Sequence, residues 1–283
     1  MKIIDVHLHF ANREGFKATA RDIAQVEYSA KGLRKEFAEA NVVAGISMTV
    51  ARRSYRQPDF LELNLEDGSL DCLAACIGVN AERLQKDKDE ILNIERALDS
   101  ERAVGLKIYP GYSPYYAYDP IYEPVYRLAA KYDVPVAIHC GDTSSPHGLL
   151  KYAHPLTIDE VAVRHPDIRF IICHLGDPWV MDTAELISKN PNVYTDVSGL
   201  IAGNESRIEK LRNTRLFMDH VQRGLVYAER YDKVLFGTDW PLVPIGPYVE
   251  FVKDIIPEAY WEDVFYHNAF KVFPKLKSFL QGG

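Results

Sequence analysis

The chain begins with the run Lys2-Ile3-Ile4-Asp5-Val6-His7-Leu8-His9, which is apolar like a buried strand but ends on two histidines. Its isoleucine and valine residues are typical of β-structure. Because side chains alternate along a strand, His7 and His9 are expected to point to the same side, together with Asp5. Two imidazoles one pleat apart can bind one metal ion. Taken alone, the run is more simply explained as an N-terminal strand with two surface histidines.

Length and composition indicate a soluble globular protein. The chain has 283 residues, of which 47% are hydrophobic and 26% charged, enough for one substantial core. The net charge of −7 and the absence of a basic block argue against a nucleic-acid partner and favour a small-molecule ligand. No apolar run approaches the roughly 20 residues of a membrane span, and no signal-peptide core follows Met1. We therefore expect a cytoplasmic protein without a membrane partner.

The four cysteines do not indicate a structural zinc site. They lie in or beside apolar runs and lack the paired Cys-x-x-Cys spacing of such sites, so we expect small buried thiols. They are Cys72, Cys76, Cys140 and Cys173.

Eight apolar runs alternate with helical patterns along the chain. The expected strands are Lys2–His9, Val42–Val50, Leu70–Val79, Ala103–Tyr109, Val134–Cys140, Ile168–His174, Val193–Val197 and Val234–Asp239. The expected helices are Tyr28–Ala40, Ala81–Asp99, Ile121–Tyr132, Thr157–His165, Val180–Asn190, a broken helix Glu205–Tyr231 and a terminal helix containing Asn268. The polar stretch Ala11–Val26 has no clear period and is expected to be a long loop.

This pattern predicts a (β/α)8 TIM barrel that forms one domain over residues 1–283. Strands that are apolar almost throughout are typical of a parallel sheet covered by helices, and eight is the number that closes into a barrel. A doubly wound open sheet is the alternative, but no Gly-x-Gly-x-x-Gly or phosphate-loop signature follows the first strand.

Ionisable residues end five of the expected strands, where the active sites of such barrels lie. They are His7 and His9, Lys107, His139, His174 and Asp239. Burying these groups is costly unless they are paired or bind a metal, so we expect them to converge. Imidazole and carboxylate ligands suit zinc, and less specifically manganese or iron(II). A buried histidine without a ligand role is the alternative for His139 and His174 taken singly.

The motifs at these strand ends resemble the amidohydrolase superfamily, and within it the amidohydrolase-2 group of metal-dependent hydrolases and aminocarboxymuconate-semialdehyde decarboxylase-like enzymes. The motifs are Asp-Val-His-Leu-His at residues 5–9, Ala-Ile-His-Cys at 137–140, Cys-His-Leu-Gly at 173–176 and Phe-Gly-Thr-Asp-Trp-Pro at 236–241. Gly-Leu-Lys-Ile-Tyr-Pro at 105–110 is a further similar segment, and the resemblance covers nearly the whole chain.

The resemblance implies a mononuclear site that holds one divalent ion, with Zn²⁺ expected and Mn²⁺ as the alternative. His7, His9, His139 and Asp239 are the implied ligands. Metal binding lowers the pKa of bound water, which would then attack the substrate. Asp239 is the implied proton acceptor, and His174 is the implied general acid or base.

Three further residues are candidates for substrate binding. Lys107 could bind a substrate carboxylate or carbonyl, but a carbamylated lysine bridging two metals and an ion pair in the barrel mouth are open alternatives. Tyr109 belongs to a tyrosine-rich segment that could wall an unsaturated substrate or simply pack on itself. Arg52 follows the second strand and could hold a carboxylate, or it could belong to a solvated loop.

We therefore expect a metal-dependent hydrolase that opens an amide, lactone or similar bond of a small acid. A metal-dependent nonoxidative decarboxylase of an aromatic or muconate-type acid is the alternative, and a hydratase would use the same ligands. A barrel that only binds a metabolite is disfavoured. Such a barrel would be expected to have lost some of the metal ligands, whereas this sequence has all four implied ligands. A homodimer is expected from the resemblance alone.

Overall fold

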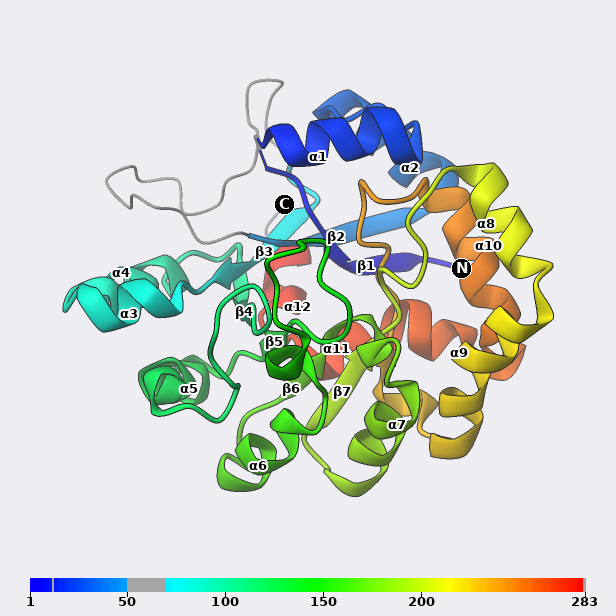
Figure 1. Ribbon diagram of the computed structural model, residues 1–283. Coiled ribbons are helices and arrows are strands. Elements are labelled where there is room, and N and C mark those ends of the chain that lie inside the picture. The colour runs from blue at the N-terminus through cyan, green and yellow to red at the C-terminus, as the bar shows by residue number, and fades with distance from the viewer. Residues whose placement is uncertain (12, 50–69, 282–283) are drawn as a thin grey trace.

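Eight parallel strands form a barrel in chain order, as the sequence predicts (Figure 1). The structure is a computed structural model, and it describes residues 1–11, 13–49 and 70–281. The strands are β1 Ile3–Leu8, β2 Val42–Met48, β3 Leu73–Gly78, β4 Ala103–Ile108, β5 Val136–Ile138, β6 Phe170–Ile172, β7 Val193–Asp196 and β8 Val234–Leu235. Backbone hydrogen bonds from Val6 to Phe236 and from Asp239 to His7 join the last strand and its extension to the first.

Helices surround the barrel in Figure 1. They are α1 Glu14–Thr19, α2 Ala30–Ala40, α3 Ala81–Lys86, α4 Glu90–Leu98, α5 Glu123–Tyr132, α6 Thr157–Arg164, α7 Val180–Lys189, α8 Glu205–Arg212, α9 Arg215–Ala228, α10 Ile245–Ile255, α11 Asn268–Val272 and α12 Leu276–Gln281. The predicted break in the helix after the seventh strand is confirmed, since α8 and α9 are separate.

Two predictions about individual segments were wrong, and one helix was not predicted. The expected loop Ala11–Val26 contains α1 and a π-helical turn at Ala20–Ala24, whose Ala20 and Ala24 are buried. The expected helix Ala81–Asp99 is two helices, because Asp87 has an extended backbone and its carboxylate accepts a hydrogen bond from the Asp89 N–H. Helix α10 was not expected, although its apolar residues at 245, 248, 249 and 252 have helical spacing.

The inside of the barrel is apolar at one end and polar at the other. Small and branched side chains such as Ile4, Ala44 and Val104 fill the interior, and Phe273 and Leu276 from the C-terminal segment pack on them. The polar residues sit instead at the carboxyl ends of the strands. In barrels of this kind the active site lies at that end.

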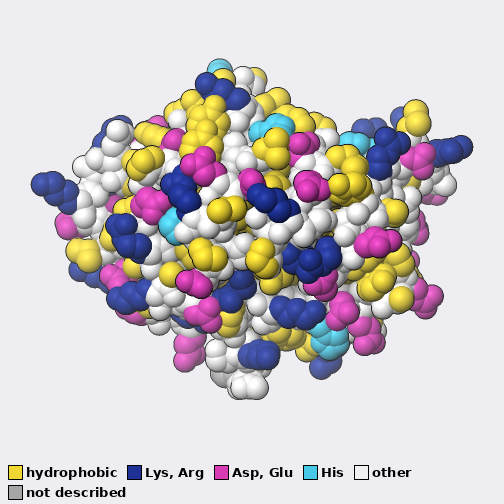
Figure 2. Space-filling model, turned by 90° about the horizontal axis from the view of Figure 1, so that it is seen from below, with side chains coloured by type: hydrophobic (Ala, Val, Ile, Leu, Met, Phe, Trp, Pro, Cys, Tyr) yellow, Lys and Arg dark blue, Asp and Glu magenta, His cyan; other side chains and the backbone are white. Residues whose placement is uncertain are grey.

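One face of the molecule carries side chains of mixed type and charge. On the face shown in Figure 2, basic, acidic and hydrophobic side chains are interspersed. No helix of the described ranges is long and apolar enough to cross a membrane.

Candidate active site

A pocket of about 660 Å³ opens at the carboxyl ends of the strands and contains the predicted polar residues. Its lining includes His7, His9, Lys107, Tyr109, His139, His174 and Asp239. The expectation that these strand ends converge is therefore confirmed. Arg52 lies outside the described residues.

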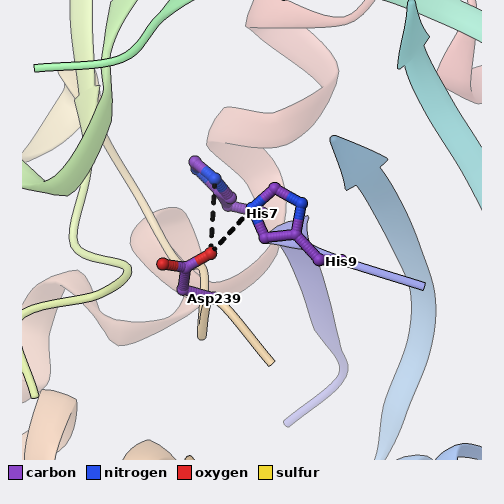
Figure 3. Close-up of side chains that lie close together, drawn as sticks. All are labelled: His7, His9 and Asp239. Atoms are coloured by element: carbon purple, nitrogen blue, oxygen red, sulfur yellow. Dashed lines mark ion pairs between the residues drawn. The ribbon is translucent and has the colours of Figure 1, made fainter. Parts of the chain in front are cut away.

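His7, His9 and Asp239 approach one another closely enough to hold one metal ion (Figure 3). Asp239 Oδ1 lies 3.1 Å from His9 Nε2 and 3.6 Å from His7 Nε2. The two histidines come from β1 and its end, and the aspartate follows β8, so the barrel closure between first and last strands creates the group.

Both histidines of this group use their other nitrogen for a hydrogen bond to an oxygen that can only accept. His7 Nδ1 lies 2.9 Å from Asp196 Oδ2, and His9 Nδ1 lies 2.8 Å from the Met48 carbonyl oxygen. A carbonyl or an ionised carboxylate has no hydrogen to donate, so each Nδ1 must carry the proton. A neutral imidazole held in this way presents a lone pair at Nε2, which is what a metal ligand needs.

Two buried atoms of the group have no hydrogen-bond partner among the described residues: His7 Nε2 and Asp239 Oδ1. Orphaned buried polar atoms are costly, and native structures rarely leave them without an ion or water. A divalent cation between the two imidazole nitrogens and the carboxylate would satisfy both atoms. The donor set of two nitrogens and one oxygen is one that zinc accepts, so the residues fit the implied metal.

His139, the fourth predicted ligand, lines the same pocket from the end of β5. Its Nε2 lies 3.0 Å from the Asp142 carbonyl oxygen, so Nε2 carries the proton and Nδ1 is the acceptor. Its ring centroid lies 5.2 Å from that of His174. The three atoms that converge most closely do not include a His139 nitrogen, and its role as a ligand stays a prediction.

His174 faces the group formed by His7, His9 and Asp239, here called the metal group, from the turn after β6. Its ring centroid is 4.7 Å from that of His7. Its backbone has a φ of 62°, as does that of Asp239, and non-glycine residues in this left-handed region are frequent at functional sites. His174 Nδ1 lies 2.9 Å from Ser198 Oγ and 3.2 Å from the Ser198 carbonyl oxygen.

Comparison with known proteins assigns the family. A model of the amidohydrolase family, the amidohydrolase-2 type, matches residues 4–275. The chain belongs to this amidohydrolase family. No curated protein matches the amidohydrolase in a sequence search.

Solved structures with the same fold cover almost the whole amidohydrolase. An uncharacterised TIM-barrel protein from Bordetella bronchiseptica is 19% identical, with 98% of this chain and 100% of that chain covered and a TM-score of 0.68. A dihydroxybenzoic acid decarboxylase from a Polaromonas species, with bound manganese and the inhibitor 2-nitroresorcinol, is 15% identical over 96% and 97%, with a TM-score of 0.66. A probable 2-pyrone-4,6-dicarboxylic acid hydrolase from Acinetobacter baumannii, with citric acid bound, is 16% identical over 97% and 100%, with a TM-score of 0.63. At these identities the likeness establishes the fold alone.

Burial sets the protonation of the amidohydrolase's site. It lowers the pKa of His7 to about 4 despite the attraction of Asp196, and it lowers the pKa of His139 well below the usual value. Burial also lowers the pKa of His174. Burial alone would raise the pKa of Asp239, but its contact with His9 and the nearby imidazoles hold that pKa below the usual range. Neutral rings and an ionised carboxylate are the forms that bind metal.

Asp196, at the end of β7, is a functional residue that the sequence analysis missed. Its carboxylate is fully buried and accepts hydrogen bonds from the His7 ring, the His174 N–H and both the N–H and hydroxyl of Ser198. Burial alone would raise its pKa, but attraction to His7 and these hydrogen bonds hold the pKa below the usual range. Its place at a strand's carboxyl end was the signal that could have found it.

His7, His174 and Asp196 form a second group whose potential metal-binding atoms lie close together. The Asp196 carboxylate of this group, however, already accepts several hydrogen bonds. Three donors point at Asp196 Oδ1, and the His7 ring nitrogen donates to Asp196 Oδ2. This second group therefore orients the two imidazoles, while the first has the orphaned atoms that a cation needs.

Lys107 is fully buried, and its ammonium group lines the pocket. Its Nζ lies 2.8 Å from Cys173 Sγ and 5.1 Å from the ring centroid of Tyr109. The Tyr109 hydroxyl donates to the Thr49 carbonyl oxygen at 2.9 Å, which fixes the ring as a pocket wall. Lys107 thus places a positive charge beside the imidazoles.

Helix α1 and the residue before it supply two lining residues that the predicted loop did not suggest. Phe16 stacks on the His9 ring, with centroids 4.8 Å apart, and Arg13 precedes the helix at the pocket wall. Phe16 thus covers one face of a histidine in the metal group.

Proposed function

We propose that this amidohydrolase is a metal-dependent hydrolase that opens an ester, lactone or amide bond of a small acid. The observation that carries the proposal is the orientation of His174. Its Nδ1 is the donor to Ser198, so the neutral ring presents Nε2 as a proton acceptor beside the His7, His9 and Asp239 group. Hydrolysis needs a group that takes a proton from water, and a neutral imidazole is suited to that role.

The proposed roles follow from position and charge. His7, His9 and Asp239, with His139 as the proposed fourth ligand, would hold one divalent ion, proposed to be zinc with manganese as the alternative. Such an ion supplies a Lewis acid that polarises a substrate oxygen and lowers the pKa of bound water. His174 Nε2 would take the proton from the attacking water and return it to the leaving group, with Asp239 as a second acceptor. The Lys107 ammonium group would neutralise a substrate carboxylate or carbonyl oxygen, and Tyr109 would wall the substrate.

A nonoxidative decarboxylase is the second candidate. A decarboxylase with bound manganese and an aromatic inhibitor shares this fold, and the buried Lys107 would suit a carboxylate-bearing substrate in either reaction. In this alternative His174, in its protonated form, would deliver a proton to carbon while the carboxylate leaves as carbon dioxide. The two reactions therefore use His174 in opposite protonation states.

Metal content is the first test of the proposal. Elemental analysis of protein purified without chelator is expected to give about one equivalent per chain, lost when His7 and His9 are both changed to alanine. If neither protein holds metal after incubation with zinc or manganese, the proposed function is wrong.

The reaction type is tested with two substrate panels. Lactones and amides of small acids are expected to be opened by the metal-loaded protein, while hydroxybenzoates release no carbon dioxide. His174→Asn is expected to retain the metal but lose about 10²- to 10⁴-fold in rate, as for removal of a general acid or base. His267→Asn is the control, because His267 is an exposed histidine remote from the pocket lining. Release of carbon dioxide without lactone opening would establish the second candidate instead.

A further inference from the structure

Asp196 lies between the two imidazoles on which the proposed chemistry depends. Its Oδ2 is 2.9 Å from His7 Nδ1, and its Oδ1 is 2.9 Å from the backbone nitrogen of His174. The same Oδ1 also accepts hydrogen bonds from the Ser198 N–H at 3.1 Å and from the Ser198 hydroxyl at 2.5 Å. One carboxylate thus contacts His7 directly and reaches His174 through both its backbone and Ser198.

The protons in this cluster can be assigned by counting donors and acceptors. The ionised carboxylate cannot donate, so His7 Nδ1 carries a hydrogen. The single Ser198 hydroxyl hydrogen is used by Asp196, so Ser198 Oγ can only accept from His174 Nδ1. The Ser198 carbonyl oxygen, 3.2 Å from the same nitrogen, also can only accept. Both rings are therefore held with the hydrogen on Nδ1 and the lone pair on Nε2.

The surrounding backbone keeps the rings in place. A Cβ on Gly199 would lie 2.7 Å from His174 Nδ1 and 3.0 Å from Asp239 Oδ2. A Cβ on Gly237 would lie 2.8 Å from the Cβ of His7. The Gly199 backbone therefore leaves the His174 ring little room on one side, and the Gly237 backbone packs closely against the Cβ of His7.

We propose that Asp196 is a positioning residue that fixes His7 and, through Ser198, His174 in the Nδ1-protonated form, so that Nε2 of both rings faces the pocket. The inference rests on the proposed function for its purpose, because an Nε2 lone pair is what a metal ligand or a general base needs. The hydrogen-bond assignment itself requires neither metal nor substrate.

Asp196→Asn separates the effect of Asp196 on His7 from its effect, through Ser198, on His174. Three donors meet at the Oδ1 position, so the amide oxygen must take that place and the amide NH₂ must face His7 Nδ1. His7 Nδ1 then has to accept, which moves its hydrogen to Nε2 and blocks the lone pair. The Ser198 hydroxyl keeps its acceptor, so His174 keeps its hydrogen on Nδ1. This isosteric substitution thus moves the hydrogen of the His7 ring from Nδ1 to Nε2. The His174 ring keeps its hydrogen on Nδ1 and serves as an internal control.

The first measurement is the histidine tautomer in metal-free protein by long-range ¹H–¹⁵N NMR of ¹⁵N-histidine-labelled chains, with signals assigned from single histidine variants. Wild type is expected to show hydrogen on Nδ1 for His7 and His174. Asp196→Asn is expected to show hydrogen on Nε2 for His7 alone. If wild-type His7 carries its hydrogen on Nε2, or if Asp196→Asn leaves His7 unchanged, the proposal is overturned.

The second measurement is affinity for Zn²⁺ and Co²⁺ by titration of the metal-free proteins. Asp196→Asn is expected to bind about 10- to 100-fold more weakly, the usual effect of losing a partner that orients a ligand. Thr195→Val is the matched control on the same strand. The buried Thr195 hydroxyl lies within hydrogen-bond distance of the backbone carbonyl oxygens of Ile172 and Asp196 and does not contact the Asp196 carboxylate or an imidazole. This variant is expected to bind metal as wild type does. Equal affinity of Asp196→Asn and wild type would overturn the proposal. If wild type binds no metal, the proposed function fails, whereas the NMR result still decides the tautomers.

Discussion

The Thr238 hydroxyl donates a 2.6 Å hydrogen bond to Asp5 Oδ2 and so joins the segment after the last strand to the first strand. The Thr238 N–H also donates to Asp5 Oδ1, and the Trp240 N–H donates to the Thr238 hydroxyl oxygen. Asp239, the carboxylate of the proposed metal group, lies between Thr238 and Trp240 in the chain. The barrel closure and the position of the metal group therefore share one buried network.

Thr238→Val is expected to destabilise the fold by about 1–3 kcal/mol, because it leaves a fully buried carboxylate oxygen without its donor. Thr238→Ser restores the hydroxyl and is expected to recover most of the loss. The free energy of unfolding from urea titration is the measurement. A valine variant as stable as wild type would show that the hydroxyl does not support the closure.

Gly199→Ala is expected to weaken metal binding and to lower the free energy of unfolding. Gly199 has a φ of 64°, where an L side chain costs about 1–2 kcal/mol, and its new Cβ would meet His174 and Asp239. Gly246→Ala is the matched control, since a Cβ there meets no atom within 4 Å. Zinc titration and urea unfolding of the two variants side by side make the comparison. If both variants behave alike, the close approach at Gly199 has no consequence for the site.

Much of this site could be predicted because parallel strands bring their carboxyl ends together. His7, His139, His174 and Asp239 each follow or end an apolar run, and all four line one pocket. Asp196 obeys the same rule, but its apolar run continues to Val197, so the pattern predicts an ordinary buried strand. The feature that distinguishes this strand is a carboxylate near the carboxyl end of an apolar run.

Other parts of the site could not be predicted from local pattern. The acceptor for His9 Nδ1 is the Met48 carbonyl oxygen, whose position depends on the pairing of β1 with β2. That pairing has a register irregularity between Asp5 and Leu8, which strict alternation of side chains does not anticipate. Phe16 lies in a polar stretch, and its ring contacts with His9 and Tyr28 join residues that local pattern does not bring together.

Lys107→Met is expected to retain one equivalent of metal. The Lys107 ammonium group donates a hydrogen bond to Cys173 Sγ, whereas His7, His9 and Asp239 supply the converging atoms that are proposed to hold the ion. Metal analysis of the variant, with His9→Ala as the control that should lose metal, is the measurement. Two equivalents in wild type that fall to one or none in Lys107→Met would make the lysine a bridging ligand, with a carbamate detectable as added mass.

Lys233 provides a test of pH-dependent stability away from the pocket. Its ammonium group is buried and donates to the Ile187 and Asn190 carbonyl oxygens at the C-terminal end of α7. Burial, with the nearby Arg230 charge, lowers the pKa of Lys233 from 10.5 to about 8, against the attraction of Asp232.

Between pH 8 and pH 10.5 the unfolded chain holds more protons on this lysine than the folded chain, so the contribution of Lys233 to stability rises with pH in that window. Below pH 8 both states are protonated and the cost of the buried charge is constant. The free energy of unfolding of wild type, minus that of Lys233→Met, is therefore expected to increase from pH 7.5 to pH 10, by at most about 3 kcal/mol. Titrations of tyrosine and other lysines occur in both proteins and cancel in the difference. A difference that stays flat or falls over this range would show that the helix-end carbonyl oxygens fully compensate the buried charge.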